Sequence, residues 1–421
     1  MVEEIILVIY TALVFLLQYI YYLCGRGKGT CIFNVLKKMA SINVLYIKVL
    51  QAFPSRDKLL TLEQENELQR YTDNVPYTKE DIDDEFLRHF EKDGNQTLLL
   101  ENNGFPIRAG SISLVYGGIL DNNPVIVKVG RKNIKVKIES ALKQLKYIVW
   151  LITLFNSKIS VDINDFLNEH RQLFLKQIDF ASELNNLQKM KHNFKNIDTV
   201  IIPTVYPEFT KKYSNMIVMD YIDGVTLNNI DDDDKDKYVE IIIKYFLKSW
   251  MYDRFYHGDF HPGNIIFVKN ETCKIGVIDF GLMNALTEFE QSGIHSFMSI
   301  MSTSDNYREG IRQFTNDIIR PKHTYDNLED SVKEDILLRI SIIIKAGFSR
   351  SYLNASDLNI INIFLRDYNL NVDPCICKFI IAITVLDSVV QRVSKGANYI
   401  DLIQRYAKSM FLTDLADLIE M

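Results

Sequence analysis

The sequence predicts an α+β chain in which a small sheet lobe precedes a larger helical lobe. Four runs rich in β-branched residues lie between positions 112 and 220, and such runs are typical of short strands. From Thr287 onward, apolar residues recur at helical spacing almost to the end of the chain. Two apolar runs at 265–268 and 275–278, separated by a polar turn, predict a buried β-hairpin in the second lobe.

The N-terminus predicts a membrane-spanning helix ahead of these lobes. Residues 5–24 are apolar except for Thr11 and Gln18, and about 20 such residues can cross a bilayer core. Two glutamates precede the run and several basic residues follow it, so the positive-inside rule places the rest of the chain on the cytosolic side. We expect a single-pass anchor, and the alternative is a buried helix of a soluble protein.

The remaining elements follow from the same periodicities. The strands predicted for the sheet lobe are 112–118, 124–129, 201–206 and 215–220. Helices are predicted over 34–69 (with a break at Pro54), 79–92, 134–156, 163–193 and 238–255. The acidic run at 231–234 is expected to be a solvated loop that caps the last of these helices.

These elements divide the chain into four predicted parts. They are a transmembrane anchor (1–25), a helical extension (26–100), a sheet lobe with a helical insertion (101–224) and a helical lobe (225–421).

Composition narrows the class of protein. With 421 residues, of which 47% are hydrophobic and 24% charged, the chain is typical of a folded protein with two or three structural units. The formal net charge of −6 argues against a nucleic-acid-binding protein, which normally presents a basic face. The five cysteines lack the spacing of a zinc site, so we expect reduced thiols in a reducing compartment.

The residues that carry chemistry flank the predicted hairpin. The segment from His257 to Asn264 reads His-Gly-Asp-Phe-His-Pro-Gly-Asn, and Asp-Phe-Gly begins at Asp279. This is the kinase-type order of base, metal ligand and metal ligand. We expect Asp259 to act as the catalytic residue that faces the acceptor, and Asn264 and Asp279 to hold the Mg²⁺ that bridges nucleotide phosphates. With the two lobes, this motif predicts a bilobal protein-kinase-like fold.

The two histidines of this segment are open to a second interpretation. His257, Asp259 and His261 alternate along the chain and could be taken for a transition-metal site. That interpretation leaves the following Pro-Gly-Asn and the Asp-Phe-Gly unexplained. We therefore expect both histidines to support the fold of the loop.

A lysine interrupts one of the predicted strands. Lys128 lies in Val-Ile-Val-Lys-Val, and an ammonium buried without a partner is costly. We expect Lys128 to contact the nucleotide phosphates and to pair with Glu183 on a helix. The alternative is a solvent-facing lysine on an edge strand. The long interval between the two residues indicates that the helix at 134–156 is an insertion.

Two further segments complete the expected nucleotide site. Ala109, Gly110 and Ser111 stand where a glycine-rich phosphate loop is expected, and small side chains let backbone N–H groups approach phosphates. Only Gly110 matches a glycine of the G-x-G-x-x-G pattern. The segment around Asp220 and Ile222 is expected to form the hinge that offers backbone groups to adenine.

Together these segments resemble the UbiB/AarF/ADCK family of atypical kinases, from about residue 42 to the C-terminus. The segments 257–264 and 279–281 are similar to its catalytic and metal-binding signatures, and 106–115 is similar to its alanine-rich loop. Asp179 and the Glu-x-x-Asn that begins at Glu183 look like its acidic helix.

The helical extension also resembles that family. Lys48 and Gln51 match the first and last residues of its Lys-x-Gly-Gln motif, but Leu50 replaces the glycine. Gln177 replaces the first acid of the family's Glu-x-Asp motif. The resemblance implies that Lys48, Gln51 and Asp179 belong to a regulatory extension, which in the family covers the groove of a protein substrate.

The resemblance implies ATP and Mg²⁺ as cofactors and a kinase or ATPase activity. It further implies a role in the metabolism of coenzyme Q or a related isoprenoid lipid at a membrane, rather than phosphorylation of proteins. Two alternatives stay open. A small-molecule phosphotransferase of the aminoglycoside or choline kinase type shares a similar loop, and a pseudokinase scaffold would bind nucleotide weakly without turning it over.

Overall fold

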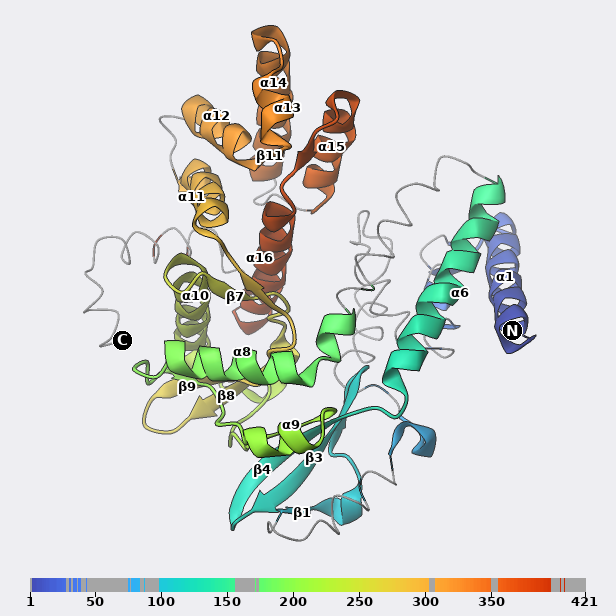
Figure 1. Ribbon diagram of the computed structural model, residues 1–421, viewed down its shortest axis with the longest axis vertical. Helices are drawn as coiled ribbons and strands as arrows, with labels where there is room; N and C mark the ends of the chain where they lie inside the picture. The colour runs from blue at the N-terminus through green and yellow to red at the C-terminus, as the bar shows by residue number, and fades with distance from the viewer. Residues whose placement is uncertain are drawn as a thin grey trace. The chain divides into compact units, whose positions relative to one another are not determined.

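The computed structural model describes residues 2–27, 30–31, 33–35, 37–38, 43, 75, 77–83, 87, 98–155, 171, 174–302, 307–349, 355–394, 402 and 405 (Figure 1). The chain forms two compact units. Unit 1 consists of Met1–Asn185 and Thr204–Tyr221, and unit 2 consists of Asn186–Pro203 and Ile222–Met421. The predicted residues 34–69 lie almost wholly outside the described part of the chain, as do Lys48 and Gln51.

Unit 1 contains an antiparallel five-stranded sheet in the order β1-β3-β4-β6, with β2 paired to β3. Its strands are β1 (Leu98–Leu100), β2 (Arg108–Ala109), β3 (Ser113–Leu120), β4 (Asn123–Gly130) and β6 (Met216–Asp220). The strands predicted at 112–118, 124–129 and 215–220 are thus confirmed to within two residues. A two-residue turn joins β3 to β4, and Asp121 and Asn122 both have positive φ there, as a tight hairpin turn requires.

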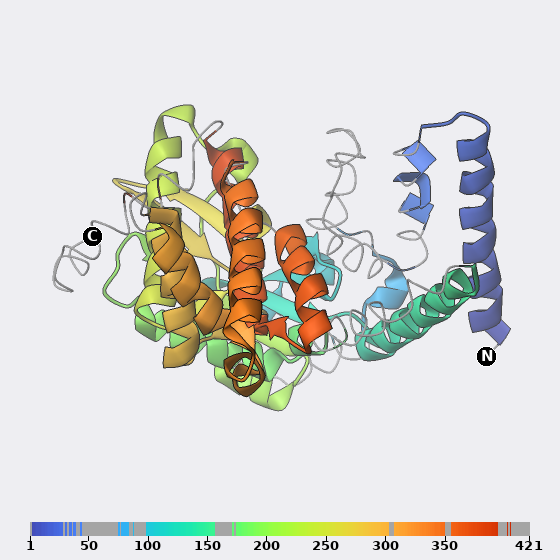
Figure 2. The ribbon, with the colours of Figure 1, turned by 90° about the horizontal axis from the view of Figure 1, so that it is seen from above.

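Helix α6 (Ile134–Phe155) confirms the helix predicted over 134–156. It contacts α1 (Val2–Leu23), and both views show the two helices side by side (Figures 1 and 2). The segment predicted as a helix over 79–92 begins differently. Residues Lys79–Asp81 form one turn of 3₁₀-helix (η1), after which Ile82 is extended.

Unit 2 combines a small sheet with a helical body. The sheet has the order β5-β9-β8, from β5 (Val200–Ile201), β9 (Cys273–Val277) and β8 (Ile265–Lys269). The predicted strand at 201–206 is wrong in length: β5 ends at Ile201, because Pro203 has no N–H to continue the ladder. The predicted hairpin is confirmed, with β8 and β9 antiparallel.

The helical body of unit 2 follows the predicted pattern. Its helices are α10 (Lys235–Met251), α11 (Glu288–Ser302), α12 (Tyr307–Ile318), α13 (Lys322–Asp326), α14 (Asp330–Ser349), α15 (Ala355–Leu365) and α16 (Pro374–Val393). Two short pairs of strands interrupt it: β7 (Phe255–His257) with β10 (Met283–Ala285), and β11 (Ile319–Arg320) with β12 (Asn371–Val372). Helix α8 (Phe180–Asn193) is shorter than the helix predicted over 163–193, of which residues 163–170 lie outside the described part.

In the acidic run at 231–234, Asp234 is not part of a solvated loop as predicted. Asp232–Asp234 form a 3₁₀ turn (η5) before α10, and the Asp234 side chain makes no capping hydrogen bond. Asp234 is buried instead, and its carboxylate pairs with Lys237 and Lys269. A buried carboxylate needs such partners, so this residue belongs to the packing around α10 and not to a solvated loop.

Helix α16 lies in the core of unit 2. Among the described side chains, α16 is the one stretch long and apolar enough to cross a membrane, with a mean hydropathy of 1.7, but half of it is buried. The part of α1 described at this level, Ile9–Leu23, is apolar but shorter. Phe379 packs against the rings of Phe246, Trp250 and Tyr256. This packing explains why α16 is apolar without invoking a bilayer.

The buried and exposed faces of α16 can be compared with two isoleucines. Ile383 is 4% exposed and Ile381 is 49% exposed. We predict that Ile383→Ala lowers the free energy of unfolding by about 2–4 kcal/mol, because it leaves a cavity. Ile381→Ala should change it by less than about 0.5 kcal/mol. Urea unfolding of the two variants measures both values, and equal losses would show that α16 is not packed as described.

Candidate functional site

The β8–β9 hairpin brings two polar residues to one end. Asn264 immediately precedes β8 and Asp279 follows β9 by two residues. Ile265 pairs with Val277, and the N–H of Ile278 donates to the carbonyl oxygen of Asn264 at 3.2 Å. Buried apolar side chains set the register of this hairpin. Asn264 and Asp279 therefore lie at the same end of the hairpin, although they are distant along the chain.

Asn264 is buried, and its amide orientation follows from its hydrogen bond. Its Nδ2 donates to the carbonyl oxygen of Asp259 at 2.9 Å. The side-chain oxygen Oδ1 is then the atom that can ligate a cation. Since the same bond ties Asn264 to Asp259, it also fixes the backbone of the predicted catalytic residue.

Asp279 is half-buried, and its carboxylate oxygen Oδ1 accepts a hydrogen bond from the N–H of Gly281 at 3.0 Å. A carboxylate and an amide oxygen are the ligand types that Mg²⁺ takes in proteins. Asn186, on α8, donates from Nδ2 to the carbonyl oxygen of Phe280 at 2.9 Å. The Asp-Phe-Gly segment is therefore held from both its own turn and the helix beside it.

His257 supports the loop, as predicted. Its ring is buried, Nδ1 accepts from the N–H of Asp259 at 3.0 Å, and Nε2 lies 2.6 Å from the carbonyl oxygen of Asp279. Burial lowers the pKa of His257, so the neutral imidazole accepts at Nδ1 and donates at Nε2. With both ring nitrogens occupied, His257 cannot be a zinc ligand, which contradicts the transition-metal interpretation.

The second histidine has a local role as well. His261 precedes the 3₁₀ turn Pro262–Asn264 (η6), and its Nδ1 accepts from the N–H of Gly263 at 3.1 Å. Gly258 lies so close to the chain after the Asp-Phe-Gly that a Cβ there would meet Asn284 Nδ2 at 2.7 Å. Both features keep the catalytic loop in one conformation.

In unit 1, Lys128 on β4 and Glu183 on α8 form a buried ion pair. The ammonium lies 2.7 Å and 2.9 Å from the two carboxylate oxygens. Lys128 is 9% exposed and Glu183 is 1% exposed, so the solvent-facing alternative for Lys128 is wrong. The Lys128 ammonium also lies 5.9 Å from the centre of the Phe180 ring. Removing either charge would leave the other buried without its partner.

The predicted phosphate loop is a tight turn between β2 and β3. Ala109 and Ser111 are buried, and the N–H of Gly110 donates to the carbonyl oxygen of Ser113 at 2.8 Å. The N–H of Gly110 is thus engaged inside the turn. A backbone donor to phosphate would have to come from another residue of the loop, which corrects the expectation for Gly110.

The predicted hinge is engaged in a similar way. The N–H of Asp220 donates to the carbonyl oxygen of Thr204 at 2.9 Å, and the N–H of Tyr221 donates to that of Pro124 at 3.2 Å. The Asp220 carboxylate accepts from the hydroxyl of Tyr206 at 2.8 Å. An N–H donor to adenine would therefore come from Ile222 or a later residue, and not from Asp220.

Asp179 begins helix α8. Its carboxylate accepts from the N–H of Ser182 at 3.0 Å, and its carbonyl oxygen accepts from the N–H of Glu183 at 3.0 Å. This is the geometry of a helix N-cap, a structural role that holds the first turn carrying Glu183. Its predicted partners in the regulatory extension, Lys48 and Gln51, lie outside the described residues.

Sequence reasoning missed Arg131, whose side chain holds the phosphate loop between β2 and β3. Its buried guanidinium donates from Nε to the carbonyl oxygen of Gly110 at 2.9 Å and from Nη2 to that of Val75 at 3.4 Å. Its Nη1 lies 2.9 Å from Asp81 Oδ2. The N–H of Val75 in turn donates to the carbonyl oxygen of Ala109 at 2.8 Å. Arg131 therefore ties the loop to the end of the extension.

Arg131 and Asp81 together form a clamp on the phosphate loop, and Asp81 supplies the negative charge that stabilises it. Burial would raise the pKa of Asp81, but hydrogen bonds from Lys137 and the N–H of Thr78, with the charge of Arg131, lower it overall. The carboxylate therefore stays ionised opposite Arg131. The only sequence signal for this clamp is an arginine three residues after Lys128, which by itself does not identify Asp81.

Arg131→Lys tests this clamp, because lysine keeps the charge but lacks the planar fork of donors. The unsatisfied carbonyl of Gly110 should cost about 1–3 kcal/mol of local stability. We predict faster amide hydrogen exchange at residues 109–113. Arg171→Lys, in an exposed pair with Glu139, is the matched control. Unchanged exchange in Arg131→Lys would contradict the contact of Arg131 with this loop.

Comparison of the sequence with known proteins identifies the family of this chain. The model of the ABC1 atypical kinase-like domain matches residues 70–311, more than half of the chain. A protein from the hydrogenase 1 5′ region of Clostridium pasteurianum is 24% identical over 89% of this chain and 70% of its own length. The probable protein kinase UbiB of Shewanella baltica (strain OS155) is 27% identical over 60% of this chain.

The Arabidopsis thaliana protein Activity of BC1 complex kinase 7, chloroplastic, is 27% identical over 58% of this chain and 35% of its own length. The chain spans about half the length of the UbiB relatives, 48% in the Shewanella baltica protein. The predicted protein-kinase-like fold and the predicted family are both confirmed. The chain belongs to the ABC1 family of atypical kinase-like proteins, the family of UbiB.

Proposed function

We propose that this chain binds ATP with Mg²⁺ and either transfers or hydrolyses the terminal phosphoryl group. The observation that carries this proposal is the end of the β8–β9 hairpin, where Asn264 and Asp279 lie with the loop of Asp259. Their oxygen donors fit a hard divalent cation.

Each residue has a separate task in this proposal. Asn264 and Asp279 would hold Mg²⁺, which when bound neutralises charge on the phosphates. Asp259 would orient the hydroxyl of an acceptor or a water molecule and accept its proton. Lys128 would contact the phosphates, with Glu183 keeping its ammonium extended. The small residues Ala109 and Ser111 would allow the nucleotide to come close to the loop, a role that the bonded N–H of Gly110 does not share.

The presence of all these polar groups favours an active enzyme over a pseudokinase scaffold. For the acceptor, we propose a lipid of the coenzyme Q type, or a step in its metabolism, on the strength of the UbiB-type motifs. The resemblance of the extension around Lys48 and Gln51 to a segment that covers the substrate groove supports a non-protein acceptor.

Magnesium-dependent ATP hydrolysis by the full chain tests the proposal. Asp279→Ala should lower kcat by about a hundredfold or more, because a metal ligand is lost. Lys128→Met should raise the KM for ATP. The control Asp367→Ala changes an exposed carboxylate of unit 2 and should change neither kcat nor KM. Hydrolysis that is indifferent to magnesium or to Asp279→Ala would contradict the proposal.

Acceptor assays extend this test. Stimulation of turnover by isoprenoid-quinol-like ligands supports the lipid assignment. Phosphorylation of choline or an amino sugar would instead assign the chain to the small-molecule phosphotransferases.

We further propose that α1 anchors the chain in a membrane, with the rest on the cytosolic side. Its large apolar side chains are exposed on more than one face: Leu13 is 57%, Phe15 is 37% and Tyr19 is 59% exposed. Such a surface is costly in water and favourable in a bilayer. This helix therefore differs from α16, whose apolar side chains are half covered by unit 2.

Alkaline carbonate extraction of membranes tests the anchor. The full chain should stay with the membrane pellet, and a chain lacking residues 1–25 should move to the supernatant. The double variant Leu13→Glu/Leu17→Glu keeps the length of the helix but places two charges in its middle, and it should also be released. Release of the unchanged chain would show that α1 does not span the bilayer.

A further inference from the structure

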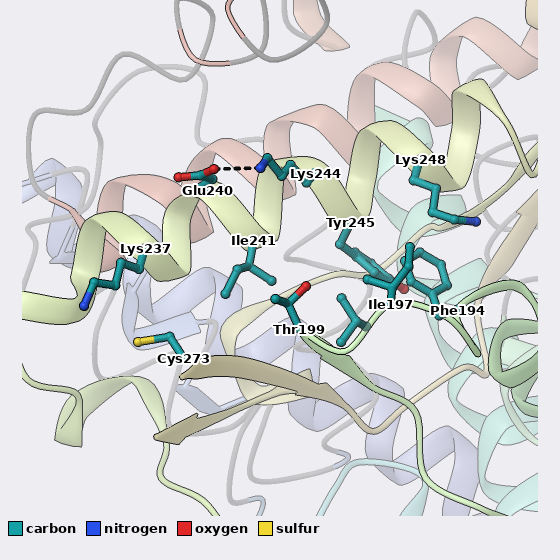
Figure 3. A pocket seen from close by; sticks show the side chains of 11 residues that line it. Phe194, Ile197, Thr199, Lys237, Glu240, Ile241, Lys244, Tyr245, Lys248 and Cys273 are labelled. Carbon is teal, nitrogen blue, oxygen red and sulfur yellow. Dashed lines mark ion pairs between the residues drawn. The ribbon is translucent and has the colours of Figure 1, made fainter. Parts of the chain in front are cut away.

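Unit 2 contains a groove between α10 and the segment that leads from α8 into β5, and none of the proposed nucleotide or metal residues lines it. Its volume is about 230 Å³, and Figure 3 shows its walls. Ile241 of α10 and Ile197, in the segment after α8, line the groove, and the contacting rings of Tyr245 and Phe194 lie at its apolar end. A cavity of about 150 Å³ is already large enough for a benzene ring. The groove can therefore take one ring or a short acyl chain.

The charges along this groove are mainly positive. Lys237, Lys244 and Lys248 follow one another at helical spacing on the same face of α10, and Glu240 is the single acidic lining residue. At 1.5 Å per residue, the three lysines extend over about 16 Å. An apolar groove with a row of ammonium groups at its rim is complementary to an amphiphilic anion.

Two of these lysines can turn to a ligand without leaving a carboxylate unpaired in the interior. Lys244 pairs with Glu240 at 2.7 Å in a half-exposed i,i+4 pair, which is a weak interaction. Lys237 pairs with Asp234, but Lys269 also pairs with Asp234 and would keep it neutralised.

Lys248 is held more firmly. Both oxygens of Asp253 lie 2.8 Å from its ammonium, which also lies 4.6 Å from the centre of the Phe194 ring. We therefore treat Lys248 as part of the wall.

The Tyr245 ring closes the apolar end of the groove. Figure 3 shows it beside Phe194 and Ile197, and its centre lies 5.0 Å from that of the Phe194 ring. The Tyr245 hydroxyl is buried, so the ring offers a ligand its carbon surface.

We propose that this groove binds a small amphiphilic anion, namely a single ring or short acyl chain that carries a carboxylate or a phosphate. The apolar body packs against Ile241 and Ile197, and the anionic group lies at Lys244 and Lys237. The groove is too small for a diacyl lipid or a whole nucleotide, since pockets for drug-sized ligands measure about 300–1,000 Å³. This site is independent of the proposed nucleotide site.

Isothermal titration of the full chain in lipid nanodiscs with phenyl phosphate tests the proposal. We expect one saturable site per chain, with benzyl alcohol and benzylamine binding at least about tenfold more weakly because they lack the negative charge. Lys244→Met should weaken phenyl phosphate binding about tenfold. Lys322→Met is the matched control, because Lys322 forms the same kind of i,i+4 pair with Asp326 elsewhere in unit 2.

Two variants separate this groove from other sites. Ile241→Trp should fill the groove and abolish binding while far-UV circular dichroism shows a folded chain; if it fails to fold, Lys244→Met decides. Asp279→Ala should leave phenyl phosphate binding unchanged even where ATP hydrolysis is lost. Equal affinity in Lys244→Met, equal binding of benzylamine, or loss of binding in Asp279→Ala would overturn the proposal.

Discussion

The register of one β-hairpin determines where the proposed metal ligands of this protein lie. Pairing of Ile265 with Val277 places the residue before β8 and the residues after β9 at the same end, and the bond from Ile278 to Asn264 closes that end. Both strands are buried, so a shift of one residue would disrupt the packing of their apolar side chains. The hydrophobic packing of the hairpin therefore determines where the two oxygen donors lie. His257 extends this constraint by joining the catalytic loop to the carbonyl of Asp279.

In unit 1, buried charged side chains fix the positions of the proposed site residues. Lys128 and Glu183 each need the other because both are largely shielded from water, and Arg131 needs Asp81 for the same reason. In the proposed function, the first pair positions an ammonium group for the phosphates. The second fixes the turn at Gly110, where a backbone carbonyl accepts from the guanidinium. Short-range packing thus orders the oxygen donors within unit 2, and paired charges order Lys128 and the turn at Gly110 within unit 1.

The predictable parts of this molecule are those encoded within short segments. The hairpin, the helix α6 and the partners Lys128 and Glu183 followed from periodicity, and from the rule that a buried ammonium needs a carboxylate. The missed features depend on contacts distant in sequence. Arg131 meets Asp81 fifty residues upstream, and no local pattern marks that carboxylate as its partner. Asp234 looked like a solvated residue because its burial comes from Lys269 on β8.

The central claim is that Asn264 and Asp279 hold one divalent ion on a nucleotide. A crystal structure of the full chain with Mg²⁺ and a non-hydrolysable ATP analogue tests it most directly. We expect the ion to be ligated by Asn264 Oδ1, a carboxylate oxygen of Asp279 and phosphate oxygens, at about 2.0–2.1 Å. An analogue bound without either side chain touching the ion, or no bound analogue at saturating concentration, would contradict the account.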